Sequence, residues 1–280
     1  MKIGSYNRLR VSRFVDFGLY LADADGNEVL LPAKWADERL VVGDEVEVFV
    51  YTDGDDRPIA TTMHPLAATG QLAMMTVKAV NDTGAFLDWG IEKDLLVPFR
   101  EQRAPMRQGR SYLVYVYLDD VSGRVAATTK IEKYVGNVLP DYRRWAEVEA
   151  VITSRTSLGY KAVVDSLHWG LIYDDELFGR EMHPGQRVKA WVRKVRDDGK
   201  IDLTLHSPAA DRADQLGRRL LARMQQLGGR LDLTDSSAPE LISSALGCSK
   251  KDFKKAVGHL LKEGKIGKDG PYFKLLTEKR

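Results

Sequence analysis

The feature of this 280-residue chain that most constrains its fold is an internal repeat. Most landmarks of residues 77–130 return 66 positions upstream, and a more divergent copy follows downstream. In that third copy, Gly159 corresponds to Gly84 and Gly185 to Gly109. A repeat of this kind indicates one supersecondary unit used three times in tandem. The offset is carried by Gly18 and Gly84, Tyr20 and Phe86, Pro32 and Pro98, Gly43 and Gly109, and Asp53 and Asp119.

Each copy contains runs in which every second residue is apolar, most clearly residues 46–50 in the first copy and 188–192 in the third. A period of two is typical of a half-buried β-strand. The glycine that interrupts each copy (Gly18, Gly84, Gly159) is typical of a bulge or a tight bend at a barrel corner. About five short strands in roughly 60 residues predict a small closed barrel of the oligonucleotide/oligosaccharide-binding (OB) type.

The motif Phe17-Gly18-Leu19-Tyr20, the apolar-Pro step at Pro32, the Gly-Asp pair before alternating valines and the closing Arg–apolar–x–Thr resemble the S1 domain. This RNA-binding barrel is named after a small-subunit ribosomal protein. The copies depart from the family pattern in places. Proline replaces the family's histidine in the first two copies and Tyr173 takes its place in the third, where Leu158 and Lys161 also replace both aromatic residues.

Beyond residue 208 the apolar period changes from 2 to 3.6. The pattern predicts a helix over 211–227, a strand over 230–234, and a helix opened by a capping box of Ser237 with Glu240 and stopped by Gly247. Ser249 is expected to cap a third helix to about residue 263, before a strand–turn–strand over 266–275. This order resembles the winged-helix modules of nucleic-acid regulators. Their recognition helix corresponds here to the one carrying Lys250, Lys251, Lys254, Lys255 and Lys262.

Three S1-type barrels followed by a winged helix resemble the bacterial conserved virulence factor B family over nearly the whole chain. The expected domains are barrels at 1–65, 66–140 and 141–207 and a winged helix at 208–280. The predicted fold class is therefore mostly β, with a small α+β C-terminal module. The resemblance implies a non-catalytic RNA-binding protein, acting as a post-transcriptional regulator, with no cofactor.

Charge is distributed unevenly, although the net charge is only +2. Residues 1–65 hold seven Lys and Arg against twelve Asp and Glu, whereas residues 208–280 hold fifteen against nine. Phosphates are attracted to the basic end and repelled by the acidic one. We therefore expect single-stranded RNA to bind mainly through the third barrel and the winged helix. A solvated lysine face is the alternative explanation of the basic end.

In the first two copies, Phe17, Tyr20 and Phe86 stand where the family stacks bases, and Arg124 belongs to the closing motif. Aromatic rings stack on bases without regard to sequence, but packing within the barrel is the alternative explanation. Trp89 and Phe99 of the second copy are further aromatic candidates, and for them the alternative is that they cover an interdomain seam.

Phe49, Tyr115 and Trp191 share one aligned position that strand alternation turns away from the barrel interior. We expect Phe49 and Tyr115 to pack between neighbouring barrels. Trp191 differs because basic residues flank it on the same face, as in single-strand grooves. The candidate RNA-binding residues of the third copy are Tyr160, Lys161, Tyr173, Lys189, Trp191, Arg193 and Lys200.

The sequence also bears on disulfide, metal, acid–base and membrane functions. A lone cysteine, Cys248, rules out an internal disulfide and a cysteine zinc site, and no metal site is expected. The loop 165–178 is rich in carboxylates near His168, so acid–base or metal chemistry is an alternative there. No run of 18 apolar residues and no basic-plus-apolar leader occurs, so we expect no membrane partner and a cytoplasmic location.

Two further hypotheses stay open. One is a DNA-binding transcription regulator whose winged helix reads duplex DNA while the barrels serve as packing or interaction modules. Arg, Asn and Gln, which read base edges, are scarce on the third helix, and this favours RNA. The other is a nuclease, which would need a metal-binding acid cluster. The oligomeric state and the target transcripts cannot be predicted.

Overall fold

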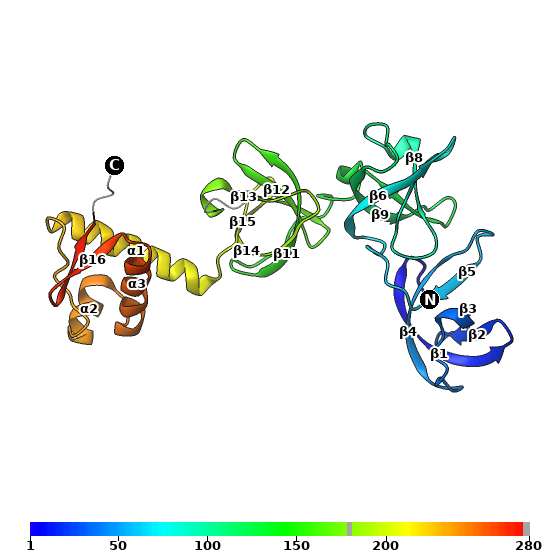
Figure 1. Ribbon diagram of the computed structural model, residues 1–280, viewed down its shortest axis with the longest axis horizontal. Helices are drawn as coiled ribbons and strands as arrows, with labels where there is room; N and C mark the ends of the chain where they lie inside the picture. The colour runs from blue at the N-terminus through cyan, green and yellow to red at the C-terminus, as the bar shows by residue number, and fades with distance from the viewer. Residues whose placement is uncertain (178–180, 277–280) are drawn as a thin grey trace. The chain divides into compact units, whose positions relative to one another are not determined.

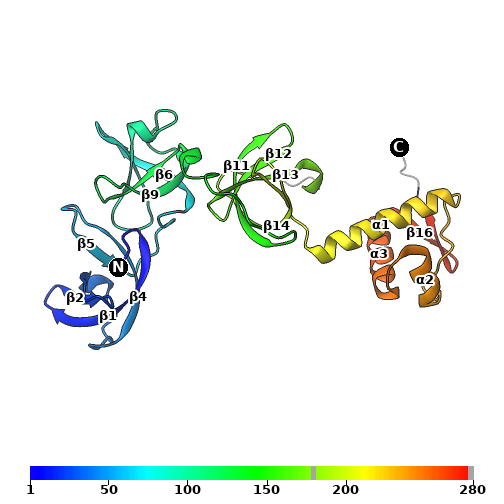
Figure 2. The same ribbon diagram turned by 180° about the vertical axis from the view of Figure 1, so that it is seen from behind.

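The computed structural model describes the backbone of residues 1–177 and 181–276, and their side chains except those of 208–214. The chain divides into two compact units, Met1–Leu203 and Thr204–Arg280. Among the described residues, the first unit holds three five-stranded sheets, and the second holds three α-helices and a two-stranded hairpin (Figures 1 and 2). The predicted fold class is confirmed.

The first sheet is a closed barrel in which alternate residues of each strand point inward, as predicted. Val48 and Val50 are buried in its core with Leu21 and Leu31. The order is β1-β2-β3-β5-β4, with the parallel pair β3–β5 closing the barrel. The elements are β1 (Ser5–Val15), β2 (Gly18–Ala22), β3 (Glu28–Pro32), the 3-10 helix η1 (Ala33–Trp35), β4 (Glu45–Thr52) and β5 (Pro58–Thr61).

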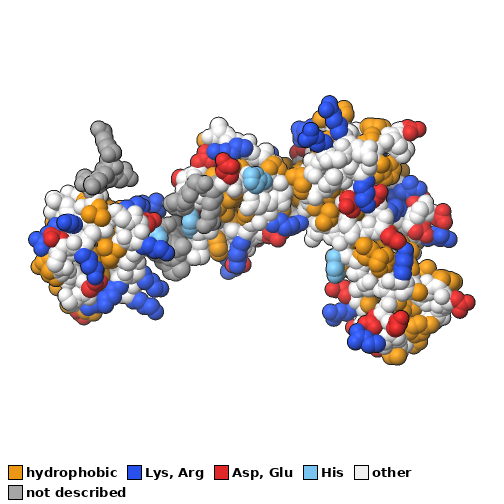
Figure 3. All heavy atoms as spheres, viewed as in Figure 1, with side chains coloured by type: hydrophobic (Ala, Val, Ile, Leu, Met, Phe, Trp, Pro, Cys, Tyr) orange, Lys and Arg blue, Asp and Glu red, His pale blue; other side chains and the backbone are white. Residues whose placement is uncertain are grey.

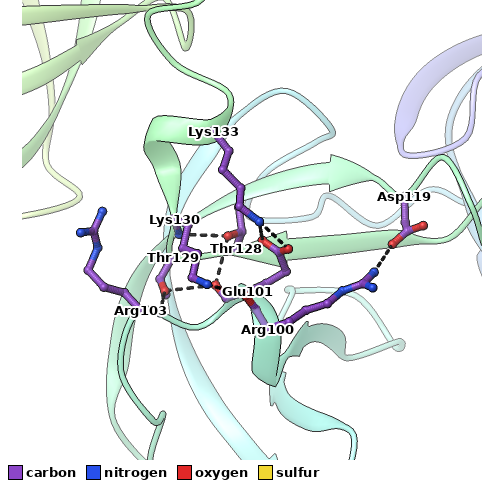
Figure 4. A network of polar contacts seen from close by, with 8 residues as sticks. All are labelled: Arg100, Glu101, Arg103, Asp119, Thr128, Thr129, Lys130 and Lys133. Carbon is purple, nitrogen blue, oxygen red and sulfur yellow. Dashed lines mark hydrogen bonds and ion pairs between the residues drawn. The ribbon is translucent and has the colours of Figure 1, made fainter.

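The second sheet has the order β10-β9-β6-β7-β8, and its end strands are joined by a polar bridge. The Glu101 carbonyl accepts hydrogen bonds from the Thr128 hydroxyl and the Thr129 amide, each 3.0 Å long (Figure 4). The elements are β6 (Leu72–Val80), β7 (Gly84–Leu87), β8 (Leu95–Pro98), η2 (Phe99–Glu101), β9 (Ser111–Leu118), β10 (Val125–Thr128) and η3 (Ile131–Lys133).

The third sheet repeats the closed topology of the first, with the order β11-β12-β13-β15-β14 and a parallel pair β13–β15. Its elements are β11 (Glu147–Thr156), β12 (Gly159–Val164), β13 (His168–Tyr173), η4 (Asp174–Glu176), β14 (Arg187–Val195) and β15 (Ile201–Thr204). The predicted acidic loop 165–178 is therefore partly strand β13, and its last residue, Phe178, lies outside the described residues.

The glycine that opens the second strand of each barrel accounts for the most regular landmark of the repeat. A Cβ added to Gly18 would lie 2.2 Å from the carbonyl oxygen of Leu31 on the adjoining strand. The corresponding distances at Gly84 and Gly159 are 2.2 and 2.0 Å, again to a backbone carbonyl oxygen. Because that oxygen cannot move without breaking the strand pair, the close approach requires glycine.

The first two barrels share a buried aromatic seam. Phe49 points out of its own barrel and packs against Trp89, whose Nε1 donates a 2.7 Å hydrogen bond to the Ala67 carbonyl. The packing role predicted for Phe49 is confirmed, as is the seam position of Trp89. Phe99, by contrast, is 50% exposed and does not cover the seam, because η2 turns it toward solvent.

Polar contacts reinforce this seam. The ammonium of Lys93 donates to the carbonyls of Thr52 and Asp53 at 2.6 and 2.7 Å, and Arg124 forms an ion pair with Asp56. Burial lowers the pKa of Lys93. Barrel two therefore holds the β4–β5 turn of barrel one.

Tyr115 lies at the seam between the second and third barrels, which confirms its predicted packing role. Its ring stacks on Tyr134 with centroids 4.8 Å apart, in a cluster that includes Val151 and Val163 of the third barrel. The amide of Gly136 donates to the Leu167 carbonyl at 2.8 Å. The segment after η3 is thus packed against the third barrel.

The second unit has the predicted order of helices and hairpin around one apolar core. Leu220, Met224, Phe253 and Val257 are buried in that core. Ser249 caps the third helix by accepting the Asp252 amide at 3.2 Å, as predicted. The elements are α1 (Pro208–Gln226), α2 (Pro239–Leu246), α3 (Lys250–Lys262), β16 (Ile266–Asp269) and β17 (Tyr272–Leu275).

Two predictions about this unit are wrong in detail. The strand expected over 230–234 is reduced to one bridge between Arg230 and Lys274. The capping box at the start of α2 does not form, because Ala238 occupies the N-cap position and the Ser237 hydroxyl accepts the Thr234 amide instead. Gly247 ends α2 as expected, with a left-handed φ of 63°.

Candidate nucleic-acid interface

The aromatic candidates of the first barrel lie at and beside the β1–β2 hairpin. Phe17 is 59% exposed at the hairpin tip. Tyr20 is half-buried, and the guanidinium of Arg13 lies 3.8 Å from the centre of its ring. Arg13 also pairs with Glu28 at 2.9 Å. A base stacking on Tyr20 would have to share the ring with this arginine, whereas Phe17 is open to solvent.

The candidates of the second barrel differ in accessibility. Phe86 is half-buried on β7, opposite Leu96 of β8. Arg124 is exposed but pairs with Asp56 of the first barrel, and the hydrogen bond from Arg124 lowers the pKa of that carboxyl. Arg124 therefore takes part in the contact between the two barrels.

The tyrosines of the third barrel are held by polar partners. Tyr160 is buried, and its hydroxyl accepts the Met182 amide at 3.2 Å. The Tyr173 hydroxyl accepts a hydrogen bond from Arg196 at 2.6 Å and donates one to Asp202 at 3.2 Å. Burial, followed by the charge of Asp202, raises the pKa of Tyr173. Tyr173 thus lies in a fixed polar cluster on the outer face of β13.

The basic candidates on and beside β14 each have a carboxylate partner. Lys189 pairs with Glu147 at 2.8 Å, Arg193 with the buried Glu176 at 2.9 Å, and Lys200 with Asp198 at 2.7 Å. Trp191 is half-buried, with the Lys189 ammonium 5.9 Å from its ring centre. The flanking pattern predicted around Trp191 exists, but acidic neighbours offset much of its charge.

Lys161 differs from these residues because it lies against an aromatic ring. Its ammonium is 3.6 Å from the ring centre of Trp169, a residue that the sequence reasoning missed. Trp169 Nε1 donates to the Val135 carbonyl at 3.1 Å. Alternation along β13 could have identified Trp169, since it lies on the same outer face as Leu171 and Tyr173.

A second group of basic side chains lies at the end of the second barrel, around the buried Glu101 (Figure 4). Burial opposes ionisation of Glu101, but hydrogen bonds, chiefly from Lys133 at 2.7 and 2.9 Å, outweigh it and lower its pKa. Lys130 donates to the Arg100 carbonyl at 2.6 Å. Arg103 points away from this network in Figure 4 and pairs with Glu132 at 2.5 Å.

The winged-helix unit presents lysines of a different kind. Within the described part of the chain, the α3 lysines form no ion pair with a carboxylate, and Lys and Arg side chains gather over this helix in Figure 3. Lys251, Lys254 and Lys255 are exposed, and Lys250 is half-buried. Lys268 and Lys274 on the hairpin are exposed as well. These side chains can meet a phosphate without first leaving a carboxylate.

The family comparisons match this architecture. A model described as "S1 domain" matches residues 3–63 and again 69–130, and one described as "CvfB-like winged helix domain" matches residues 218–275. Two Staphylococcus proteins named conserved virulence factor B align with most of the chain. The chain belongs to the conserved virulence factor B family. Its S1 and winged-helix domains are nucleic-acid-binding types, so nucleic acid is the class of ligand that this family architecture supports.

Similarity to individual members of the family is moderate but extensive. The Staphylococcus saprophyticus protein is 24% identical over 93% of this chain and 90% of its own length, and one from Staphylococcus aureus is 25% identical over 81% and 78%. An uncharacterised Bacillus subtilis protein, YitL, is 27% identical over 95% and 91%. A crystal structure of a Streptococcus pneumoniae multidomain protein with nucleic-acid-binding domains covers 98% of each chain, with 23% identity and a TM-score of 0.40.

Two other kinds of feature are absent from the residues that the structure describes. Groups of three or more His, Cys, Asp or Glu side chains able to hold a metal ion do not occur there. The described helices include none with the length and apolar character needed to cross a bilayer.

Proposed function

We propose that this is a non-catalytic RNA-binding protein that acts as a post-transcriptional regulator, binding single-stranded RNA mainly through the third barrel and the winged helix. The observation that carries the proposal is the lysine face of α3, defined by Lys250, Lys251, Lys254 and Lys255, which has no carboxylate partner among the described residues. Neutralising phosphates with such side chains releases counterions and supplies most of non-specific affinity.

Single-stranded RNA is favoured over a duplex by the chemistry of both surfaces. The 13 residues of α3 contain no Arg, Asn or Gln, the residues that read base edges with paired hydrogen bonds. Lysines attract phosphates without reading sequence. In the third barrel, the outer face of β12 and β13 combines Lys161 and Tyr173 with Trp169, and OB-type barrels bind single strands with such basic and aromatic surfaces.

Competition binding tests the choice of nucleic acid. The whole chain would be titrated against a fluorescent single-stranded RNA, with unlabelled single-stranded RNA, single-stranded DNA and duplex DNA as competitors at one fixed salt concentration. We expect the RNA to compete most strongly. A stronger effect of duplex DNA would replace this proposal with the alternative one, a transcription regulator whose α3 and β16–β17 hairpin bind DNA while the barrels serve as interaction modules.

The non-catalytic part of the proposal needs its own measurement. Radiolabelled RNA would be incubated with the purified chain in Mg²⁺ or Mn²⁺ and separated on a denaturing gel. We expect intact RNA at all times. Cleavage that depends on the metal ion and co-purifies with the protein would show a nuclease instead.

A further inference from the structure

The junction of the second and third barrels brings basic side chains from two domains to one place. The 3-10 helix η3 of the second barrel leads directly to Val135 and Gly136, and both residues touch Trp169 of the third barrel. The Val135 carbonyl accepts the Trp169 Nε1 hydrogen bond at 3.1 Å. A Cβ at Gly136 would lie 2.8 Å from the Trp169 ring, so the backbone of the second barrel lies against that ring. The ring is thus fixed between two domains.

The ring of this tryptophan is also in contact with Lys161, whose ammonium is 3.6 Å from the ring centre. Lys161 is half-buried, and no described carboxylate pairs with it. Burial lowers its pKa first of all, while Lys200 and Arg103 lower it further and Glu132 acts in the opposite sense. Lys161 therefore lies near one cation of its own barrel, Lys200, and one of the second barrel, Arg103.

Arg103 is the contribution of the second barrel. Its backbone amide is held by the Thr129 hydroxyl at 2.7 Å, next to η3, while its guanidinium extends away from the Glu101 network (Figure 4). Its ion pair with Glu132 joins two side chains that are 66% and 51% exposed. Exposed pairs of this kind contribute little free energy, so an incoming phosphate can replace Glu132 as the partner of Arg103.

We infer that Arg103 of the second barrel joins Lys161 and Lys200 of the third in one binding surface for the sugar–phosphate backbone of RNA, so that a bound strand crosses the junction of the two barrels. This inference rests on the proposed RNA-binding function and adds a residue and a path to it. Trp169 serves as a positioning residue, because Lys161 and the backbone at Gly136 already lie against its ring, and it holds Lys161 toward the junction. Glu132 limits affinity by competing with the phosphates for Arg103.

Matched variants of the full chain test this surface. Arg103→Ala removes a guanidinium that is 66% exposed and pairs with Glu132. The control is Arg10→Ala in the first barrel, which removes a guanidinium that is also 66% exposed and pairs with Glu45. Affinity for an oligouridylate of about 12 nucleotides, within the range of OB-type sites, would be measured by fluorescence anisotropy. We expect Arg103→Ala to weaken binding about three- to tenfold, as for one lost charge-assisted contact, and Arg10→Ala to change it less than twofold.

The slope of log Kd against log salt gives a second readout. Losing one phosphate contact to a single strand should reduce the slope by about 0.7. We expect that reduction for Arg103→Ala and for Lys161→Met, which keeps an aliphatic chain over Trp169. Glu132→Gln should act in the opposite direction and tighten binding, whereas Glu45→Gln should leave it almost unchanged.

The outcomes separate this inference from the function on which it rests. Equal effects of Arg103→Ala and Arg10→Ala, in a wild-type chain that binds RNA, would overturn the junction surface and leave the proposed function standing. A Glu132→Gln variant no tighter than Glu45→Gln would overturn it as well. A wild-type chain that binds no RNA would refute both. Circular dichroism spectra of each variant, compared with wild type, would confirm that the changes act on binding.

Discussion

The ring of Phe49 meets the ring of Trp89 edge-on, with centroids 5.4 Å apart and planes at 86°. One ring comes from β4 of the first barrel and the other from the loop after β7 of the second, and both are essentially buried. Buried aromatic pairs at this spacing and angle contribute free energy beyond the area that they bury. The first two barrels are therefore coupled through their outer surfaces, and neither buries its seam residues alone.

Replacing Trp89 should uncouple the two barrels. Trp89→Ala removes a fully buried indole and its hydrogen bond to the Ala67 carbonyl, so we expect a loss of about 3–5 kcal/mol in the free energy of unfolding. Denaturant unfolding followed by circular dichroism would measure it. Phe99→Ala, at a site that is 50% exposed in the same barrel, should cost less than about 1 kcal/mol. Similar losses for both variants would show that the seam is not a cooperative contact.

The ion pair between the buried Glu101 and the exposed Lys133 should make stability depend on pH. The pKa of Glu101 lies below its ordinary value of 4.5, because hydrogen bonds from Lys133 outweigh the effect of burial. A carboxyl with a depressed folded-state pKa stabilises the protein above the unfolded-state pKa, and this stabilisation is lost as pH falls through the lower folded-state value.

Glu101→Gln should therefore reduce stability by about 1–3 kcal/mol at pH 7. The difference from wild type should shrink as pH falls below about 4.5, where the carboxyl begins to take up a proton in the unfolded wild-type chain while the folded protein still resists it. Thermal unfolding of both proteins between pH 7 and pH 3 would measure this. A difference that stays constant across that range would contradict the assignment.

The lysine face of α3 should supply affinity without sequence preference. The triple variant Lys251→Ala, Lys254→Ala and Lys255→Ala should weaken binding of all single-stranded RNA sequences alike and flatten the salt slope by about 0.7 per lost contact. The control replaces three exposed, carboxylate-paired arginines of the first barrel and should have a much smaller effect: Arg10, Arg39 and Arg57. An equal loss of affinity in the two triple variants would show that RNA binding depends on net charge and not on the lysine face of α3.

The cap of α3 should matter for the stability of the winged-helix unit. Ser249 accepts the Asp252 amide at 3.2 Å and also donates to its carboxylate at 2.7 Å. Ser249→Ala should cost about 1 kcal/mol, the usual effect of losing an N-cap. Ser243→Ala, on the exposed face of α2, should be neutral or slightly stabilising because alanine favours helix. Amide hydrogen exchange along α3 would detect the difference.

Features that depend on residues close together in the sequence, such as strand alternation and helix capping, could be predicted. Alternation turned Phe49 and Tyr115 away from their own barrels, and both pack between domains. The cap at Ser249 followed from residues three positions apart. The capping box at Ser237 failed because Ala238 begins α2, and the Ser237 hydroxyl is bound to Thr234 instead.

The partners of charged side chains could not be predicted in the same way. Arg124 pairs with Asp56, which lies 68 residues away in sequence, and Arg193 pairs with Glu176, a buried residue of η4. Such pairs depend on how strands from different parts of the chain meet, and alternation alone does not show it. The same limit explains why Arg103 was missed, whereas alternation along β13 could have identified Trp169.

The glycine at the start of the second strand in each barrel has a consequence for how such a chain can diverge after duplication. Any side chain at Gly18, Gly84 or Gly159 would collide with a neighbouring backbone oxygen, so drift at this position is restricted to changes that rebuild the strand pair. The outward residues have no such constraint. In copies of one ancestral unit, outward aromatic residues could thus be replaced by lysines, and a ligand-binding surface could become a contact between barrels, while every copy kept the same topology.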